Sequence, residues 1–131
     1  MLKLLRQNKT ARSLLAATAG FLVYGSWALF INYEYGFAAA LKAGLTQGGY
    51  SFILTLGLSF MMEWLFQLSR QPIRQFNLTF ITTCLLIYAT SWSINVLSGT
   101  PEILLTILPG AIASTLYTLS YTMALFKVQQ A

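Results

Sequence analysis

The stretch from Gly48 to Ser69 reads GGYSFILTLGLSFMMEWLFQLS, and it decides the class of the fold. It is long and apolar enough to cross a bilayer as one helix, which takes about 20 apolar residues. It also contains an acid, Glu63. Because an ionisable side chain inside a membrane costs several kcal/mol, it usually faces a partner group or a water-filled cavity. The stretch therefore predicts a membrane protein and makes Glu63 the first residue to explain.

The composition extends this prediction to the whole chain of 131 residues. Hydrophobic residues make up 56% of it and charged residues only 8%, whereas a soluble domain carries about 25% charged residues. At about 20 residues a span, four spans use most of the chain and leave no room for a separate soluble domain. We predict an all-α fold, an integral membrane four-helix bundle that forms a single domain.

Three further apolar runs give the other spans. The predicted spans are residues 13–32, 48–69, 78–97 and 103–126, with an outer helical extension of the second span at 37–47. The apolar run of the first span is about 18 residues long, beyond the 7–15 of a signal peptide, so we expect it to stay uncleaved. In the last span, Pro109-Gly110 predicts a kink, and Thr100 before it is expected to cap the helix.

The positive charges indicate how the chain is threaded. The net charge is +5, and most cations lie beside predicted spans: Lys3, Arg6, Lys9 and Arg12 before the first, Arg70 and Arg74 in the loop 70–77, and Lys127 after the last. This placement follows the positive-inside rule and argues against a nucleic-acid partner. We predict a bacterial cytoplasmic membrane protein with both termini in the cytoplasm (N-in, C-in). Residues 1–12 form either a short interfacial helix or a tail that only sets the topology.

Few residues offer catalytic or metal chemistry. The chain has no histidine and a single cysteine, Cys84, which rules out an intramolecular disulfide and the common zinc sites. It has no aspartate, and its three acids fall on different sides of the predicted membrane, with Glu63 toward the cytoplasm and Glu34 and Glu102 outside. We therefore predict no catalytic residue, no cofactor and no metal site, and a protein that is not an enzyme.

Polar residues recur every four positions in two of the spans. The second span carries Ser51, Thr55, Ser59, Glu63 and Gln67, and the last span carries Thr106, Gly110, Ser114, Thr118 and Thr122. Against a helical turn of about 3.6 residues, such a row drifts by about 40° a step and winds slowly around its helix. The two rows are either a packing seam with interhelical hydrogen bonds or the lining of a solute path.

Glu63 itself has three interpretations. Arg70 lies seven residues further on, about 10 Å along the same helical face, and would neutralise Glu63 in an ion pair. Alternatively, Glu63 couples transport to a proton or a cation, or it contacts a partner protein. The other residues predicted to lie near Glu63 are Gln67, Ser59, Tyr117 and Tyr121.

The first and third predicted spans end in similar patterns. Each has a tyrosine, then Ser-Trp, then an asparagine four residues before a glycine: Tyr24, Ser26, Trp27, Asn32 and Gly36 in the first, and Tyr88, Ser91, Trp92, Asn95 and Gly99 in the third. Both patterns are predicted to face the outer surface. They indicate either a tandem repeat of two helical hairpins, with Asn32 and Asn95 as equivalent sites, or two similar aromatic girdles at the membrane interface.

Two functions fit these features. In the first, the protein is a small transporter or permease-like protein with Glu63 as the coupling group; four short helices enclose little volume, so it would act as a homo-oligomer. In the second, it is an accessory or scaffold subunit whose polar rows dock a larger membrane protein. The lipid bilayer is the surrounding partner in both.

Overall fold

The computed structural model describes residues 8–130 and is all-helical over that range. Its elements are α2 (Lys9–Ile31), the short 3-10 helix η1 (Tyr33–Tyr35), α3 (Phe37–Gln67), α4 (Pro72–Ser98) and α5 (Ile103–Gln130). Within the described residues, four helices are long and apolar enough to cross a membrane. The all-α prediction is confirmed, and these four helices have the length and composition of membrane spans.

The helices extend beyond the predicted spans. α3 stays helical from Phe37 through Gly48-Gly49, so the predicted extension at 37–47 is continuous with the second span. The predicted loop 70–77 is wrong in its second part, because α4 already begins at Pro72. Proline suits this first helical position, where its missing N–H would have no partner in the helix. Of the basic segment, residues 1–7 lie outside the described residues, and the part from Lys9 onward belongs to α2.

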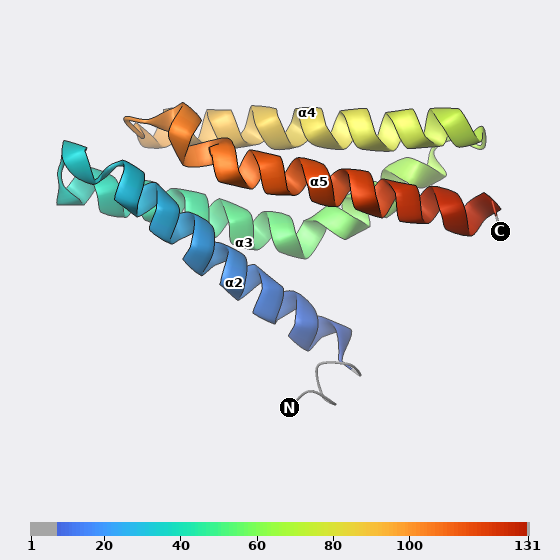
Figure 1. Ribbon diagram of the computed structural model, residues 1–131, viewed down its shortest axis with the longest axis horizontal. Helices are drawn as coiled ribbons and strands as arrows, with labels where there is room; N and C mark the ends of the chain where they lie inside the picture. Colours follow the sequence, from blue (N-terminus) through green and yellow to red (C-terminus); the bar gives the residue numbers. More distant parts are fainter. Residues whose placement is uncertain (1–7, 131) are drawn as a thin grey trace.

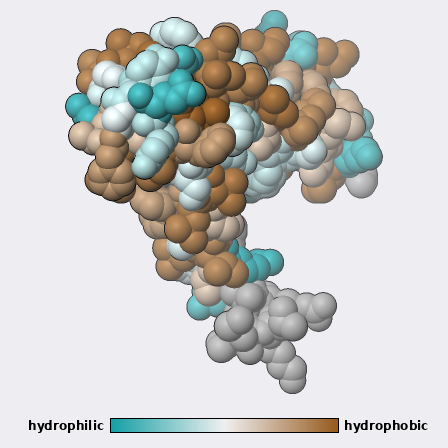
Figure 2. Space-filling model, turned by 60° about the vertical axis from the view of Figure 1, so that its left-hand side comes forward, coloured by the Kyte–Doolittle hydropathy of each residue, from teal (hydrophilic) through white to brown (hydrophobic). Residues whose placement is uncertain are grey.

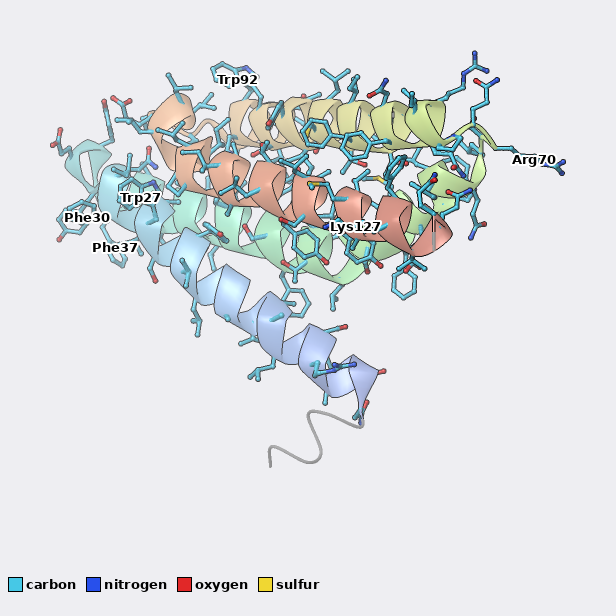
Figure 3. The ribbon with its side chains drawn as sticks, turned by 45° about the vertical axis from the view of Figure 1, so that its right-hand side comes forward. Trp27, Phe30, Phe37, Arg70, Trp92 and Lys127 are labelled. Atoms are coloured by element: carbon cyan, nitrogen blue, oxygen red, sulfur yellow. The ribbon has the colours of Figure 1, made fainter. Side chains whose placement is uncertain are left out.

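Figure 1 shows the arrangement of the four helices. The turns at 32–36 and 99–102 lie together at one end of the bundle, which we call the closed end. The turn at 68–71 and the end of α5 lie at the other, which we call the open end. α4 and α5 run side by side with α3, whereas the first turns of α2 stand apart from the other helices (Figures 1 and 3). The bundle is therefore tight at one end and splayed at the other.

Three glycines set the close crossing of α2 and α3. A Cβ atom on Gly25 would lie 3.0 Å from the carbonyl oxygen of Gly44, and one on Gly44 would lie 3.0 Å from the carbonyl oxygen of Gly25. On the next turn of α3, a Cβ atom on Gly48 would lie 3.0 Å from the carbonyl oxygen of Phe21. Gly44 and Gly48 form the small-xxx-small spacing that lets membrane helices approach backbone to backbone. This contact is the point from which α2 diverges.

The interior mixes polar and apolar side chains, and the exterior is largely apolar. The largest fully buried side chains are all polar except Met62: Asn32, Asn95, Thr79, Thr83, Thr106, Thr118 and Thr122. Large apolar side chains such as Leu97 and Ile73 are instead exposed, and Figure 2 shows hydrophobic residues over much of the visible face. In lipid, burial of apolar groups drives no assembly, and a buried polar group without a partner is costly. The hydroxyls of Thr79, Thr83 and Thr118 have no hydrogen-bond partner within the described residues. The apolar exterior is compatible with a lipid environment.

Candidate functional site

Glu63 is joined to α5 by a hydrogen bond. The hydroxyl of Tyr121 donates to Oε1 of Glu63 at 2.5 Å, and both side chains are partly buried. One turn before Tyr121, the ring of Tyr117 packs beside it with the ring centroids 5.8 Å apart. Glu63 is the sole acid within the four α-helices, since Glu34 lies in η1 and Glu102 precedes α5. Two of the predicted neighbours of Glu63, Tyr117 and Tyr121, therefore belong to one cluster with it.

The predicted ion pair between Glu63 and Arg70 is not formed. Over residues 8–130 no salt bridge joins the two, and the Arg70 side chain is exposed and points away from the bundle (Figure 3). The physical reason is that α3 ends at Gln67. Arg70 thus lies in the turn beyond the helix, where a seven-residue spacing no longer places it on the same face. Gln67 is exposed as well.

A cleft of about 800 Å³ opens beside this cluster. Tyr117 and Tyr121 of α5 and Ser59 of α3 line one wall. The α2 wall opposite is lined largely by small residues, among them Ala16 and Gly20, with Arg12 in the first turn. Sites for small molecules are typically about 300–1,000 Å³, so the cleft has the size of a ligand site. It exists because α2 diverges from the bundle.

A smaller polar cavity continues from the cleft toward the closed end. It has a volume of about 40 Å³, and its lining includes Gln47, Tyr50 and Ser91. A cavity needs about 10–15 Å³ to hold one water, so about three waters fit here. Tyr24 and Ser114 line both the cavity and the cleft. The two spaces are neighbours along one polar route into the bundle.

Asn32 closes the route on the α2 side. Its side chain is fully buried, and its Nδ2 donates to the Ala28 carbonyl oxygen and to the Thr106 hydroxyl, each at 2.8 Å. Its Oδ1 accepts the backbone N–H of Glu102 at 3.0 Å. These bonds, which we call the Asn32 network, fasten the end of α2 to the beginning of α5.

Asn95 makes a matching set of bonds between α4 and α3. Its Nδ2 donates to the Ser91 carbonyl oxygen at 2.9 Å and to Oε1 of Gln47 at 3.0 Å. Its Oδ1 accepts a hydrogen bond from the Thr100 hydroxyl at 2.9 Å. Thr100 was predicted to cap α5, but its hydroxyl donates to Asn95 instead. We call these bonds the Asn95 network. Each asparagine donates to the carbonyl four residues before it and to a side chain of the other hairpin.

Two aromatic side chains add further links at the closed end. Pro109 has no N–H to donate to the carbonyl four residues earlier, which is that of Leu105; the indole Nε1–H of Trp27 donates to this oxygen at 2.8 Å. The hydroxyl of Tyr35 donates to Oε1 of Glu102 at 2.6 Å. This hydrogen bond to Glu102 is the main cause that raises the pKa of Tyr35 above its ordinary 10.0. Neither link was predicted. The position of Pro109 in the sequence does indicate that the carbonyl oxygen of Leu105 needs another donor.

The two predicted polar rows have mixed roles. At the closed end they pack, as the bond between Thr106 and Asn32 shows, whereas Thr55, Ser59 and Ser114 line the cleft. A third row, on α4, was not predicted: Gln75, Thr79, Thr83, Ser91 and Asn95 are all buried. Its four-residue steps, which pass over Ile87, repeat the spacing seen in the other two spans, and that spacing was the available signal.

No protein-family model matches the chain, and no curated protein or solved structure is similar to it.

Proposed function

We propose that the protein is a small proton-coupled membrane transporter, in which the cleft receives the solute and Glu63 carries the coupling proton. One observation supports this above others: the sole acid of the four α-helices is hydrogen-bonded to a wall of a ligand-sized cleft. An ionisable group inside a membrane protein is by default a candidate for a proton or ion pathway. The cleft is wide toward the open end and narrows toward the hydrogen-bonded closed end. That is the shape of a transporter open to one side.

The Tyr121 hydroxyl suits a carboxyl group that gains and loses a proton. A hydroxyl donates to a carboxylate and, after rotating its hydrogen, accepts from a carboxylic acid. The pair therefore keeps its geometry in both protonation states of Glu63. An arginine partner would instead hold the charged form permanently. The neutral partner seen here favours a titrating role for Glu63 over a structural one.

The membrane setting is proposed on the charges. The basic residues that precede and follow the helices support a cytoplasmic open end by the positive-inside rule, and we propose a bacterial cytoplasmic membrane with both termini inside. One chain encloses a cleft and not a channel, which favours a homo-oligomer for a complete route. Because Glu63 faces a neutral tyrosine and not a second acid or a nucleophile, we propose binding and transport and not an enzyme.

The asparagine networks support the tandem repeat of two helical hairpins. Asn32 ends the first helix of one hairpin and Asn95 the first helix of the other, and both precede a glycine of positive φ by four residues. Each bonds across to the second helix of the other hairpin. Two similar aromatic girdles would not require this reciprocal pattern.

A scaffold subunit is the second candidate, favoured by the exposed first half of α2. Leu14, Leu15 and Leu22 are 46%, 56% and 59% exposed, and a helix of a partner protein would find room beside them. In that case the cleft is permanently filled, and the closed end never opens.

Thiol labelling from each side of the membrane distinguishes the two candidates. The sole native thiol is removed by Cys84→Ser, and Ser114→Cys and Ser91→Cys then report on the cleft and the small cavity. In oriented vesicles, a membrane-impermeant maleimide should label Ser114→Cys from the open-end side. A transporter requires that Ser91→Cys also reacts from the closed-end side, at a rate that Glu63→Gln changes. No labelling from that side, together with a stoichiometric co-purifying partner, would establish the scaffold instead.

A further inference from the structure

We propose that the cleft binds a hydrophobic organic cation, held by the Glu63 carboxylate and the rings of Tyr117 and Tyr121. This inference rests on the proposed transport function and names its class of solute.

The charge of the site is negative and has no cation beside it. In the described chain the hydrogen-bond partner of Glu63 is the neutral Tyr121, which occupies Oε1. A carboxylate in an apolar medium is unfavourable unless a cation pairs with it or a proton neutralises it. The site thus has one place that a positive group or a proton can fill, and not both together.

The tyrosine pair adds a surface that suits a cation. Tyr117 and Tyr121 lie one turn apart on α5, their rings are tilted by 32° with centroids 5.8 Å apart, and both line the cleft. The face of an aromatic ring attracts a cation, and aromatic side chains around a carboxylate are a recurrent way to bind quaternary ammonium groups. The same rings pack against apolar substituents, so they accept a bulky cation better than a metal ion.

The rest of the cleft fits an apolar body. Ala16, Ala19 and Gly20 leave space along α2, and Leu54 and Leu58 supply apolar surface on α3. The first turns of α2 stand apart from the other helices (Figures 1 and 3), so a solute dissolved in the membrane would enter sideways there. A hydrophobic molecule with one positive charge matches both parts of the cleft.

An anionic solute fits less well. Arg12 is the cationic residue of the lining. It is exposed and belongs to the first turn of α2, on the wall opposite the tyrosines, at the mouth of the cleft. The rest of the polar lining consists of hydroxyl groups. Glu63 lies one turn from Ser59 toward the open end and is hydrogen-bonded to Tyr121 of the wall. A negative group beside the two tyrosines would therefore meet a like charge.

Binding of the cation excludes a proton from Glu63. Where the carboxyl group is protonated, its O–H bond breaks and the proton leaves to water as a singly charged cation takes its place. The cation then balances the carboxylate charge, so at most one proton is released for each cation bound. Reprotonation from the other side of the membrane would expel the cation and complete the exchange.

The test measures binding of tetraphenylphosphonium to the full chain in lipid nanodiscs by equilibrium dialysis. Glu63→Gln should weaken binding by at least about tenfold, which corresponds to loss of one charge contact. Tyr117→Leu should weaken it by about threefold, the lower range of a cation–π contact. Glu34→Gln, an exposed acid of η1, is the matched control and should change nothing. Proton release on cation binding, recorded with a pH indicator in weak buffer, should not exceed one proton per cation with the wild type and should be absent with Glu63→Gln.

Tetraphenylborate, an anion of nearly the same shape, is the second probe. Wild-type protein should bind it at least about tenfold more weakly than the cation, a difference of one charge contact. Equal binding of both probes, or cation binding that Glu63→Gln leaves unchanged, would overturn the proposal, as would tighter binding of the anion that Arg12→Gln abolishes. Should Glu63→Gln fail to fold, Glu63→Asp keeps the charge and must retain proton release. Cation binding does not require transport. The dialysis experiment can therefore fail while the labelling experiment still supports a transporter, and the reverse is also possible.

Discussion

The carbonyl oxygen of Leu105 shows how one residue corrects a defect made by another. Pro109 withholds its usual hydrogen bond, and in a membrane no water replaces it. Trp27, from a different helix, donates its indole N–H to that oxygen. The proline therefore leaves free the acceptor through which Trp27 ties α5 to α2.

Trp27→Phe should lower the free energy of unfolding by about 1 kcal/mol, because it leaves a carbonyl oxygen unsatisfied. The measurement is reversible unfolding in bicelles. Trp92→Phe is the matched control, since Trp92 is 47% exposed and makes no described hydrogen bond. In a Pro109→Ala background, alanine restores the N–H to Leu105, and Trp27→Phe should then cost clearly less. An equal cost in both backgrounds would show that Trp27 acts by packing alone.

For single residues, the sequence predicts which side chains matter better than it predicts which partners they bind. Glu63 stands out because an acid in an apolar run is costly wherever its partner lies, and Tyr121 was among its predicted neighbours. One of its three interpretations paired it with Arg70, which required α3 to continue past Gln67. Because the helix ends three residues before Arg70, the arginine faces the solvent and not the acid.

The α2–α3 crossing is the element on which the cleft depends. Gly25 and Gly44 bring the two backbones into contact near the closed end, and α2 departs from there. Any side chain at the contact would push the helices apart, because neither backbone has an alternative position in a bundle fastened at its closed end. The glycines thereby set both the tight part of the fold and the angle of the open part.

Gly44→Ala should destabilise the protein by about 1–3 kcal/mol, the range for forcing extra atoms into a packed contact. Its added Cβ would lie 3.0 Å from the Gly25 carbonyl oxygen. Gly57→Ala is the matched change in the same helix, with no atom within 4 Å of its Cβ. It should be neutral or stabilise by up to about 1 kcal/mol through helix propensity. Unfolding in bicelles checks both, and equal effects would remove the crossing as the cause.

Elements were largely predictable and their limits were not. The four spans follow from length and hydropathy, which the bilayer imposes directly. The first turn of α4 was missed because Pro72 was placed in a loop, although proline also suits the first position of a helix. The spacing of Gly44 and Gly48 is legible in the sequence, yet which helix they contact depends on tertiary structure.

The whole molecule is fastened at one end by polar groups and open at the other. The Asn32 and Asn95 networks share no residue, and each joins the two hairpins. Their polar partners come from distant parts of the chain, so the sequence pattern marked the two asparagines but not what they bind. A solute path along the polar rows was one of two interpretations of the sequence, but the position of the cleft was not predicted, because it results from the angle of α2 and not from any residue type.

Asn32→Ala and Asn95→Ala should each lower the free energy of unfolding by about 2 kcal/mol, since each leaves several buried groups without partners. Because the networks are separate, the double variant should show the sum of the two losses within about 0.5 kcal/mol. Asn77→Ala, at an exposed position of α4, is the control with no loss. A double variant well short of the sum would mean that the closed end opens as one unit once either network is broken.

Because α2 diverges from the bundle, the width of the cleft depends on the tilt of α2 and therefore on the thickness of the membrane. From the contact at Gly25 to Arg12 the helix runs about 20 Å at about 1.5 Å a residue, so a rotation of about 10° at the crossing moves its first turn by about 3.5 Å. A helix adapts to a thinner or thicker bilayer by changing its tilt, at a cost of fractions of a kcal/mol per Å. The width of the cleft then depends on the thickness of the surrounding bilayer. In lipids of different acyl length, the same chain will have clefts of different width.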